Sequence, residues 1–330
     1  MSMPPSEQAR NFAILGVAGY IAPRHLRAIK ETGHQLVAAC DPSESVGILD
    51  RWFFDTRYFR EFERFDRHVE KLRRRGEGER IHYVSICSPN YLHDAHMRFA
   101  LRIGADAICE KPLVINPWNL EPLVELEREH GRRIHTILQL RVHPVLMALR
   151  ERLAVEAREA GPGARKHEVV LSYVTARGPW YGNTWKGDAA RSGGISTNIG
   201  IHFFDLLLWL FGGVEGFEVH VSDGRRASGF LELARATVRW FLSIDRDDLP
   251  QPPAPGGPAT FRSITVDGAE VEFSEGFADL HTAVYREILA GRGFGIDDAR
   301  PSIALAHAIR NSTPVGPTAR SHDLAARRAR

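Results

Sequence analysis

Short apolar runs alternate with segments of helical period through the first 140 residues of the chain. The runs at 12–19, 34–41, 83–89 and 106–112 are almost continuously apolar, and the segments between them repeat apolar residues every three or four positions. Uninterrupted apolar strands are typical of burial on both faces. The pattern therefore predicts a parallel sheet with helices on both sides.

The rhythm changes after about residue 140. A helix is expected over 145–159, and longer strand-like runs follow at 167–178, 217–224, 227–244, 263–268 and 270–276. Asp267-Gly268 lies between two alternating runs and is a hairpin signal. Helices are expected again at 279–290 and 297–310. This half of the chain is predicted to be an α+β domain with a mostly antiparallel, open sheet.

Three regions follow from these patterns. Residues 11–140 form the parallel-sheet domain, 141–310 form the α+β domain, and 311–330, rich in Pro, Ala and Arg, form a mobile basic tail. Residues 1–10 are expected to be a loose leader. The Pro- and Gly-rich stretch 250–258 is expected to be a surface loop.

Composition and charge exclude several classes of protein. A chain of 330 residues is long enough for about two domains. Its 43 basic and 41 acidic residues leave a formal charge of +2, so no global field draws it to nucleic acid or to an anionic membrane. The longest apolar stretch, 199–211, is too short to span a bilayer. No secretory signal is visible, and we expect a cytoplasmic protein.

The three cysteines, Cys40, Cys87 and Cys109, each lie in or beside an apolar run. An odd number cannot all pair, and a cysteine within an apolar run is typically a small core residue. We expect buried strand thiols and no metal site.

The first apolar run ends in a turn that is typical of dinucleotide-binding Rossmann domains. Gly16 would form the tight turn, and Gly19 and Ala22 would let backbone and helix approach closely, while Ala18 stands where G-x-G-x-x-G has its middle glycine. The residues that would contact the cofactor here are Gly16, Ala18, Gly19, Tyr20 and Ile21, and a pyrophosphate would lie on the helix amides. A small-residue turn that binds nothing is the alternative.

Two further strand ends add polar groups. Asp41 follows the second strand, where a carboxylate accepts hydrogen bonds from the adenosine ribose and repels a 2'-phosphate, so NAD is favoured over NADP. The segment containing Ser88, Pro89, Asn90 and His93 follows a later strand and would lie near the nicotinamide half. The alternatives are a turn carboxylate before proline and a Ser-Pro-Asn turn.

Candidate catalytic groups lie in two segments. Lys111, after Glu110 at the end of a buried strand, could polarise a reacting oxygen, and both residues are also expected at the cofactor. If a helix begins near residue 197, Asn198, His202 and Asp205 share one polar stripe on it. A salt-bridged lysine and a core histidine are the alternatives.

Cations and aromatic residues gather just before that stripe. The candidate substrate-binding residues are Arg177, Trp180, Tyr181, Trp185, Lys186, Arg191, Asn198 and His202. Arginine and lysine pair with phosphate and carboxylate oxygens, and aromatic rings pack on sugar or base faces. A subunit contact is the alternative. Gln139, also expected at the cofactor, and Arg141 would border the sugar pocket.

Taken together, these motifs resemble the Gfo/Idh/MocA family of NAD(P)-dependent sugar oxidoreductases. The resemblance rests on the turn at 16–22, the SPNYLH segment, the Glu110-Lys111-Pro112 triplet and the G-G-x(6)-G-x-H-x-x-D pattern at 193–205. It implies that Lys111 and His202 flank the sugar hydroxyl and that His202 takes its proton. Many members carry aspartate where this chain has Asn198, so Asn198 is expected to bind the substrate or Lys111.

One branch of this family is still more similar. Its members oxidise the C3 hydroxyl of UDP-N-acetyl-glucosaminuronic acid for lipopolysaccharide O-antigen synthesis, and they are known to retain NADH and reoxidise it with 2-oxoglutarate. The similarity implies that activity here, and the family commonly forms dimers and tetramers, so a homotetramer is expected. Two alternatives remain, a dehydrogenase of another sugar or inositol and a non-catalytic NAD-bound sensor.

Overall fold

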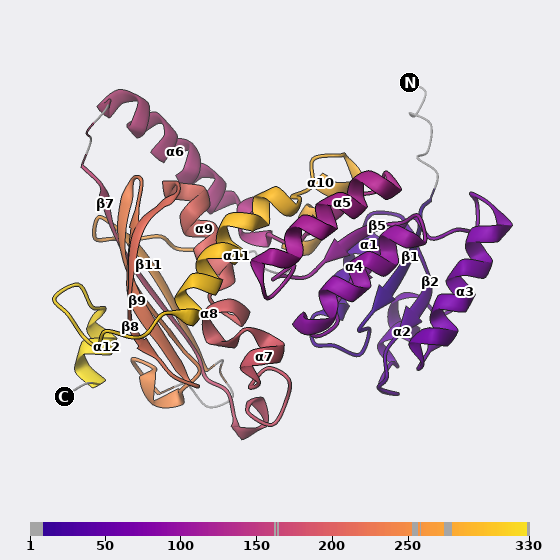
Figure 1. Cartoon of the computed structure of the whole chain (residues 1–330), viewed down its shortest axis with the longest axis horizontal. Coiled ribbons are helices and arrows are strands. Elements are labelled where there is room, and N and C mark those ends of the chain that lie inside the picture. The colour runs from indigo at the N-terminus through magenta and orange to yellow at the C-terminus, as the bar shows by residue number, and fades with distance from the viewer. Residues whose placement is uncertain are drawn as a thin grey trace. The chain divides into compact units, whose positions relative to one another are not determined.

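The computed structural model describes residues 9–161, 163, 165–252, 257, 259–273 and 279–328. The chain divides into two compact units, whose helices and strands are labelled in Figure 1. Unit 1 comprises Met1–Val114, Trp118–Gln139 and Ala278–Asp298, and unit 2 comprises Ile115–Pro117, Leu140–Phe277 and Ala299–Arg330. The chain therefore changes unit at 139/140 and later returns to unit 1, a return that the linear pattern did not predict.

Unit 1 contains the predicted parallel sheet. Its strands are β1 (Asn11–Leu15), β2 (Gln35–Cys40), β3 (Arg57–Phe59), β4 (Tyr83–Ile86), β5 (Asp106–Cys109) and β6 (Ile134–Thr136). They are all parallel and lie in the order β3-β2-β1-β4-β5-β6. This is the strand order of a dinucleotide-binding sheet, and its order reverses between β1 and β4.

The helices of unit 1 explain the apolar strands. They are α1 (Ala22–Glu31), α2 (Ile48–Trp52), α3 (Phe62–Arg75), α4 (His93–Arg102), α5 (Leu120–His130) and α10 (Leu280–Leu289). Four consecutive residues of β1 are buried because its sheet is covered on both faces. Helix α10, from the returning segment, packs beside α1. The three cysteines are buried and unpaired in the strand ends, as predicted.

Unit 2 contains a second six-stranded sheet, which is mostly antiparallel as predicted. Its strands are β7 (His167–Thr175), β8 (Val214–Ser222), β9 (Arg226–Leu233), β10 (Ala236–Ser243), β11 (Thr260–Val266) and β12 (Ala269–Glu270), in the order β12-β11-β7-β10-β9-β8. Only β7 and β10 pair in parallel among these described strands. Asp267 and Gly268, both with positive φ, form the predicted hairpin turn.

The helices expected at 145–159 and 297–310 are both present, and unit 2 also contains short helices that the sequence did not predict. The helices of unit 2 are α6 (Pro144–Ala160), α7 (Ala189–Ser192), α8 (Gly194–Asn198), α9 (Ile201–Phe211) and α12 (Asp323–Arg328), and α11 (Ile296–Asn311) begins in unit 1 and ends in unit 2. Short 3-10 turns occur at Asn90–Leu92, Pro117–Asn119, Gln139–Val142, Pro179–Tyr181 and Arg246–Asp248.

The C-terminal segment differs from the mobile tail expected from its composition. Its described residues pack on the sheet of unit 2, where Ala325 joins a core cluster with Val174 and Phe241. His322 is buried, stacks on Phe241 and lies 2.8 Å from the Ser172 hydroxyl through Nε2. A few apolar residues at the right spacing are enough to dock the segment, although its overall composition is polar.

His322 makes this docking sensitive to acid. Burial lowers the pKa of His322 to about 4, below the ordinary value of 6.5, so the folded state favours the neutral ring. Its stabilising contribution is present above pH 6.5 and is lost as the pH falls toward 4, an effect of up to about 3 kcal/mol. We expect the midpoint of urea unfolding to fall as the pH is lowered from 6.5 to 4. In His322→Gln, the contribution of His322 to this decrease should be absent. An identical pH dependence in the variant would contradict the assignment.

Three of the predicted segments lie partly outside the residues that the structure describes. Most of the leader at 1–10, part of the loop at 250–258, and residues 274–276 of the last strand-like run lie outside the described residues. Among the described helices, none is by itself long and apolar enough to cross a membrane, while the pair Ala189–Asn198 and Ile201–Phe211, bent by 43°, meets the criterion on length and composition only.

Candidate functional site

The residues predicted to bind a dinucleotide all belong to unit 1 and follow the carboxyl ends of its strands. They are Gly16, Ala18, Gly19, Tyr20 and Ile21 after β1, Asp41 after β2, Ser88, Pro89, Asn90 and His93 after β4, Glu110 and Lys111 after β5, and Gln139 after β6. Carboxyl ends of parallel strands meet at one edge of the sheet, and ligands bind there at the point where the strand order reverses. The topology thus brings the predicted set to one edge.

The turn after β1 explains the need for glycine at its first position. Gly16 has φ +85°, and a Cβ atom there would lie 2.6 Å from the carbonyl carbon of Cys87 and the amide nitrogen of Ser88. Only glycine allows the turn to pass so close to the end of β4. Gly19 donates its N–H to Gly16, and helix α1 begins three residues later without a side-chain cap. The amides of Ala22 and Arg24 donate to the carbonyls of Gly19 and Ile21, and Pro23 has no N–H, so the first turn of α1 is already hydrogen-bonded to the backbone of the turn.

Asp41 supports this turn from the next strand. Its Oδ2 accepts the backbone N–H of Ala18 at 3.0 Å, and its Oδ1 accepts that of Ser43 at 2.8 Å. A carboxylate has about four acceptor positions, so two remain for the hydroxyls of a ribose. Ala18, at the middle position of the motif, thus takes part in the turn through its backbone amide.

His93 joins two of the strand ends. The ring is fully buried, with Nδ1 2.7 Å from the carbonyl oxygen of Pro112 and Nε2 2.9 Å from that of Ser88. The hydroxyl of Ser88 lies 2.8 Å from His96. The contacts described for the His93 side chain are therefore with the protein, and they brace the loop after β4 against the loop after β5.

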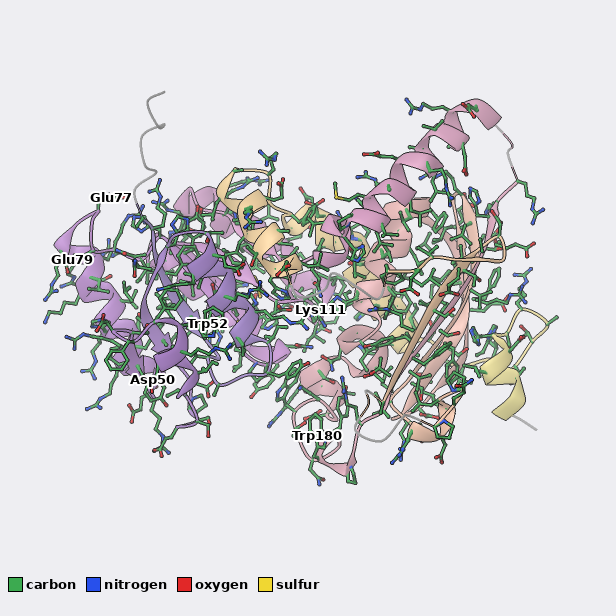
Figure 2. All side chains as sticks on the ribbon, turned by 180° about the vertical axis from the view of Figure 1, so that it is seen from behind. Asp50, Trp52, Glu77, Glu79, Lys111 and Trp180 are labelled. Atoms are coloured by element: carbon green, nitrogen blue, oxygen red, sulfur yellow. The ribbon has the colours of Figure 1, made fainter. Side chains whose placement is uncertain are left out.

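Lys111 follows β5 immediately after Glu110 and is partly buried (labelled in Figure 2). Its backbone N–H donates to Oε2 of Glu110 at 3.3 Å, and the Lys111-Pro112 peptide bond is cis. Gln139, after β6, is also buried, and its Oε1 has no hydrogen-bond partner within the described part of the chain. A buried carbonyl oxygen without a donor at this edge fits a site that binds a polar ligand such as a nicotinamide amide.

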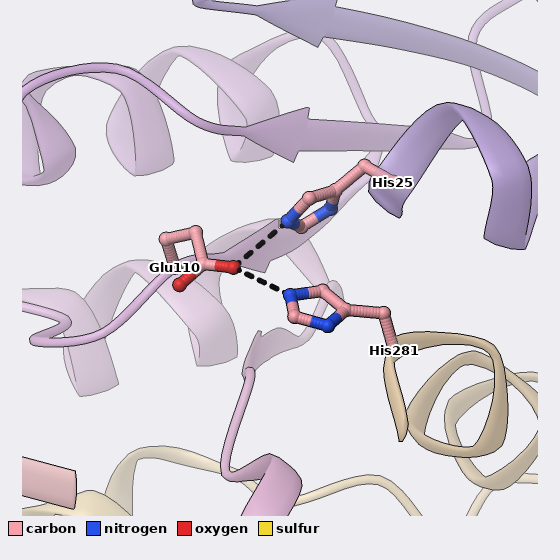
Figure 3. Close-up of side chains that lie close together, drawn as sticks. All are labelled: His25, Glu110 and His281. Atoms are coloured by element: carbon pink, nitrogen blue, oxygen red, sulfur yellow. Dashed lines mark hydrogen bonds and ion pairs between the residues drawn. The ribbon is translucent and has the colours of Figure 1, made fainter. Parts of the chain in front are cut away.

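The sequence analysis did not predict a cluster of two histidines around Glu110, the residue before Lys111. Oε1 of Glu110 lies 3.0 Å from Nε2 of His25 on α1 and 2.9 Å from Nε2 of His281 on α10 (Figure 3). All three side chains are buried. A histidine among the core residues Leu26 and Ile29 of α1 was the available signal, but its partners lie far away in sequence.

In unit 2, the predicted polar stripe is interrupted. Asn198 ends α8, and His202 and Asp205 lie on α9, with a break at Ile199 and Gly200 and a bend of 43°. A single helix through these residues is therefore wrong. A Cβ atom at Gly200 would lie 2.8 Å from Leu242 of β10 and from Phe204, so the glycine lets the junction pack directly on the sheet.

The three residues of the stripe have different surroundings. Nδ2 of Asn198 donates to the hydroxyl of Tyr181 at 2.9 Å, while His202 is half-buried at the start of α9. Asp205 accepts both Nε and Nη2 of Arg141, at 3.0 and 2.8 Å, in a bidentate pair. The pair anchors α9 to the 3-10 turn at Gln139–Val142.

The Arg141–Asp205 pair predicts a stability effect. Its side chains are 10% and 3% exposed, and removing one partner from a buried pair typically costs about 3–5 kcal/mol. We expect Arg141→Met to lower the free energy of unfolding by about this amount, measured by urea titration. The double variant Arg141→Met with Asp205→Leu should recover much of the loss, because no charge then remains unpaired. Equal loss in the single and double variants would contradict this explanation.

The cations and aromatic residues predicted to bind substrate also belong to unit 2. Nζ of Lys186 lies 5.4 Å from the ring centre of Trp180 and 5.8 Å from that of Trp185 (Trp180 is labelled in Figure 2). Burial, and then the charge of Arg177, lower the pKa of Lys186. Arg191 pairs with Asp188 at 3.3 Å. Two cations in one partly desolvated segment favour the binding of an anion.

Comparisons with known proteins identify the family of the chain. The family model described as "Oxidoreductase family, NAD-binding Rossmann fold" matches residues 10–137, and that described as "Oxidoreductase family, C-terminal alpha/beta domain" matches 167–240. The 2,7-anhydro-N-acetylneuraminate hydratase of Mediterraneibacter gnavus is 26% identical over 221 residues, 66% of this chain and 53% of that protein. This chain thus spans about half the length of that curated relative.

Solved structures are similar over nearly the whole chain. The WlbA (WbpB) dehydrogenase from Thermus thermophilus in complex with NAD and UDP-GlcNAcA is 53% identical, with a TM-score of 0.88, covering 95% of this chain and 98% of that chain. The same dehydrogenase in complex with NAD and alpha-ketoglutarate is 52% identical with the same TM-score and coverage. The fold, the strand order and this degree of identity show that the chain belongs to the Gfo/Idh/MocA family of NAD-binding oxidoreductases.

Proposed function

We propose that the protein oxidises the C3 hydroxyl of UDP-N-acetyl-glucosaminuronic acid to the 3-keto sugar with NAD as the oxidant. The observation that carries the proposal is the 53% identity, across 95% of the chain, to a dehydrogenase solved with NAD and this nucleotide sugar. The same relative, solved with alpha-ketoglutarate, supports a second half-reaction in which that oxo acid reoxidises the cofactor.

Unit 1 offers a site that fits NAD. The glycine turn at Gly16, the acceptor positions of Asp41 and the buried, unpartnered Oε1 of Gln139 lie at the strand ends where the pyrophosphate, the ribose and the nicotinamide amide need partners. When bound, NAD accepts the hydride that leaves C3. The carboxylate of Asp41 disfavours a 2'-phosphate, which supports NAD over NADP.

Lys111 and His202 are the proposed catalytic residues, with Asn198 as a substrate-positioning group. Lys111 donates a hydrogen bond to the C3 oxygen, and His202 accepts the proton of the hydroxyl, so that C3 loses a hydride and its oxygen loses a proton. Asn198 cannot take up a proton, and its amide is already oriented by the hydroxyl of Tyr181. Its proposed role is therefore a hydrogen bond to the sugar.

The segment at 177–191 is proposed to bind the anionic groups of the substrate. Lys186 lies over two tryptophan rings beside the charge of Arg177, and a diphosphate or a uronate neutralises both cations. The exposed face of Trp180 suits a sugar or uracil ring. The proposed partners are the UDP-sugar and 2-oxoglutarate. A homotetramer is proposed as well, on the resemblance to a family that commonly forms dimers and tetramers.

The absorbance of reduced nicotinamide in the purified protein tests the proposal. We expect it to rise when UDP-N-acetyl-glucosaminuronate is added and to fall when 2-oxoglutarate follows, as that acid is reduced to the 2-hydroxy acid. Protein purified with NADH already bound should be bleached by the oxo acid alone.

Two substrate analogues sharpen this test. UDP-N-acetylglucosamine lacks the carboxylate, and free N-acetyl-glucosaminuronate lacks the nucleotide, so both should give a much smaller rise. No absorbance change in either step, with bound NAD verified by mass spectrometry, would overturn the substrate assignment. A rise with inositol or a free sugar instead would redirect it to the other dehydrogenases of the family.

A further inference from the structure

Two buried histidines bind the side chain of Glu110, the residue before Lys111. Glu110 precedes Lys111, and its Oε1 is shared by His25 and His281, which reach it from α1 and α10 (Figure 3). Nε2 is the contacting atom in both rings, at 3.0 and 2.9 Å. His25 is completely buried, and the exposed fractions of His281 and Glu110 are 1% and 7%.

The hydrogen bonds around this cluster determine where its protons lie. A carboxylate only accepts, so each histidine donates from Nε2. Burial opposes ionisation of Glu110, but the hydrogen bonds from His25 and His281 outweigh it and hold the pKa of Glu110 well below its usual value. Burial also lowers the pKa of His25, so its ring is neutral. The cluster is a buried carboxylate that accepts hydrogen bonds from two imidazole rings.

A second layer fixes the tautomer of His25. With Nε2 protonated, Nδ1 accepts from the hydroxyl of Tyr285 at 2.8 Å, and that hydroxyl in turn lies 2.6 Å from Ser85. Burial, with the neighbouring Cys87, raises the pKa of Tyr285 well above its usual value, so the phenol keeps its proton. In the chain of hydrogen bonds that runs from Ser85 through Tyr285 and His25 to Glu110, each bond thus has one donor and one acceptor.

The cluster acts on Lys111 through the other oxygen of the carboxylate. Oε2 of Glu110 accepts the backbone N–H of Lys111 at 3.3 Å. On the far side of Lys111, the carbonyl of Pro112 lies 2.7 Å from Nδ1 of His93. The backbone that carries the lysine is therefore held on both sides by buried side chains of unit 1.

A metal ion is the other chemistry open to two histidines and a glutamate. Their three ligand atoms lie within 4.8 Å of one another. Zinc sites in proteins are almost always four-coordinate, and the described group supplies three atoms in a site closed to solvent. Hydrogen bonding satisfies the same atoms at ordinary donor–acceptor distances without a further ligand. The geometry favours the hydrogen-bonded cluster.

We propose that His25 and His281, through the carboxylate of Glu110, are positioning residues that fix the backbone of Lys111 for the oxidation. The inference rests on the catalytic role given to Lys111 under the proposed function. A displacement of a reacting group by about 1 Å can cost about 100-fold in rate. Loosening the cluster should therefore lower kcat while leaving the binding of NAD and sugar nearly unchanged.

Paired substitutions at His281 separate positioning from packing. His281→Leu removes the donor, and His281→Gln keeps an amide N–H near the place of Nε2. We expect the leucine variant to lose about 10-fold to 100-fold in kcat, with KM for the sugar and Kd for NAD within about threefold, and the glutamine variant to recover most of the rate. His322→Leu, which removes a buried histidine of unit 2, is the control for a loss of stability alone.

Two measurements do not depend on turnover. Wild-type protein should show low-field proton NMR signals from the two Nε2–H groups, and Glu110→Gln should shift or remove both. Hydrogen exchange of the Lys111 amide should accelerate in His281→Leu and remain slow in His281→Gln and in His322→Leu. Should His281→Leu fail to fold, Tyr285→Phe, which removes only the hydroxyl that fixes the tautomer of His25, serves in its place.

Several results would overturn the inference. Equal kcat and equal exchange in the leucine and glutamine variants would do so, as would stoichiometric zinc that is retained by the wild-type protein and lost with His281. An inactive wild-type protein with intact low-field signals and a protected Lys111 amide would instead contradict the proposed substrate. The two failures are thus distinguishable.

Discussion

Lys111→Met is expected to lower kcat for UDP-N-acetyl-glucosaminuronate by about 1000-fold. General acid–base and hydrogen-bond groups at the reacting atoms typically contribute 100-fold to 10,000-fold, and methionine keeps the length of the side chain while removing its charge and donors. Kd for NAD should change far less than kcat, because most of the residues predicted to bind the cofactor follow the other strands of the sheet. Steady-state rates and cofactor titration of the same preparation measure both quantities.

The matched control for Lys111→Met is Lys111→Arg, which keeps the positive charge but presents a larger, planar group. Only a modest recovery is expected, because arginine does not reproduce the point donor of lysine. Full activity in the methionine variant would contradict the catalytic role. It would also favour the alternative in which the chain binds NAD without catalysing a reaction.

The second large effect is expected at His202, the proposed proton acceptor. His202→Gln keeps a polar side chain of similar size but cannot accept and hold a proton, so kcat should fall by about 100-fold to 10,000-fold. The reduction of bound NAD in a single turnover should slow equally, because the affected step is the chemistry itself. Stopped-flow absorbance of reduced nicotinamide measures this step directly.

Combining the substitutions tests whether the two residues act on the same step. Groups that act as a unit give losses that do not add, so Lys111→Met with His202→Gln should cost little more than the worse single variant. A loss equal to the product of the single effects would indicate independent roles. His202→Gln with an unchanged single-turnover rate would remove His202 from the proton transfer.

Much of the fold was predictable because its signals are local. Apolar runs with helical segments between them predicted the parallel sheet, and Asp267-Gly268 predicted the β11–β12 hairpin, since both depend on neighbouring residues. The positions of Asp41 and Lys111 at strand ends followed from the same pattern. Strand direction alone then brings these ends to one edge of the sheet.

Other features depend on contacts that no local pattern contains. The break between α8 and α9 is set by the packing of Gly200 on Leu242 of β10, so helical periodicity alone placed Asn198 and Asp205 on one continuous helix. The C-terminal segment is ordered by a few apolar side chains against the sheet of unit 2, although its composition suggested mobility.

The environment of Lys111 shows the same division most clearly. That a lysine follows a buried strand was predictable from neighbouring residues, because the apolar run and the Glu110-Lys111-Pro112 triplet are contiguous. Only the tertiary structure brings His281, 171 positions away from Glu110, to the same carboxylate oxygen as His25. A buried charge needs hydrogen-bond donors from the elements that surround it. The tertiary fold decides which elements these are, and they need not be close in sequence.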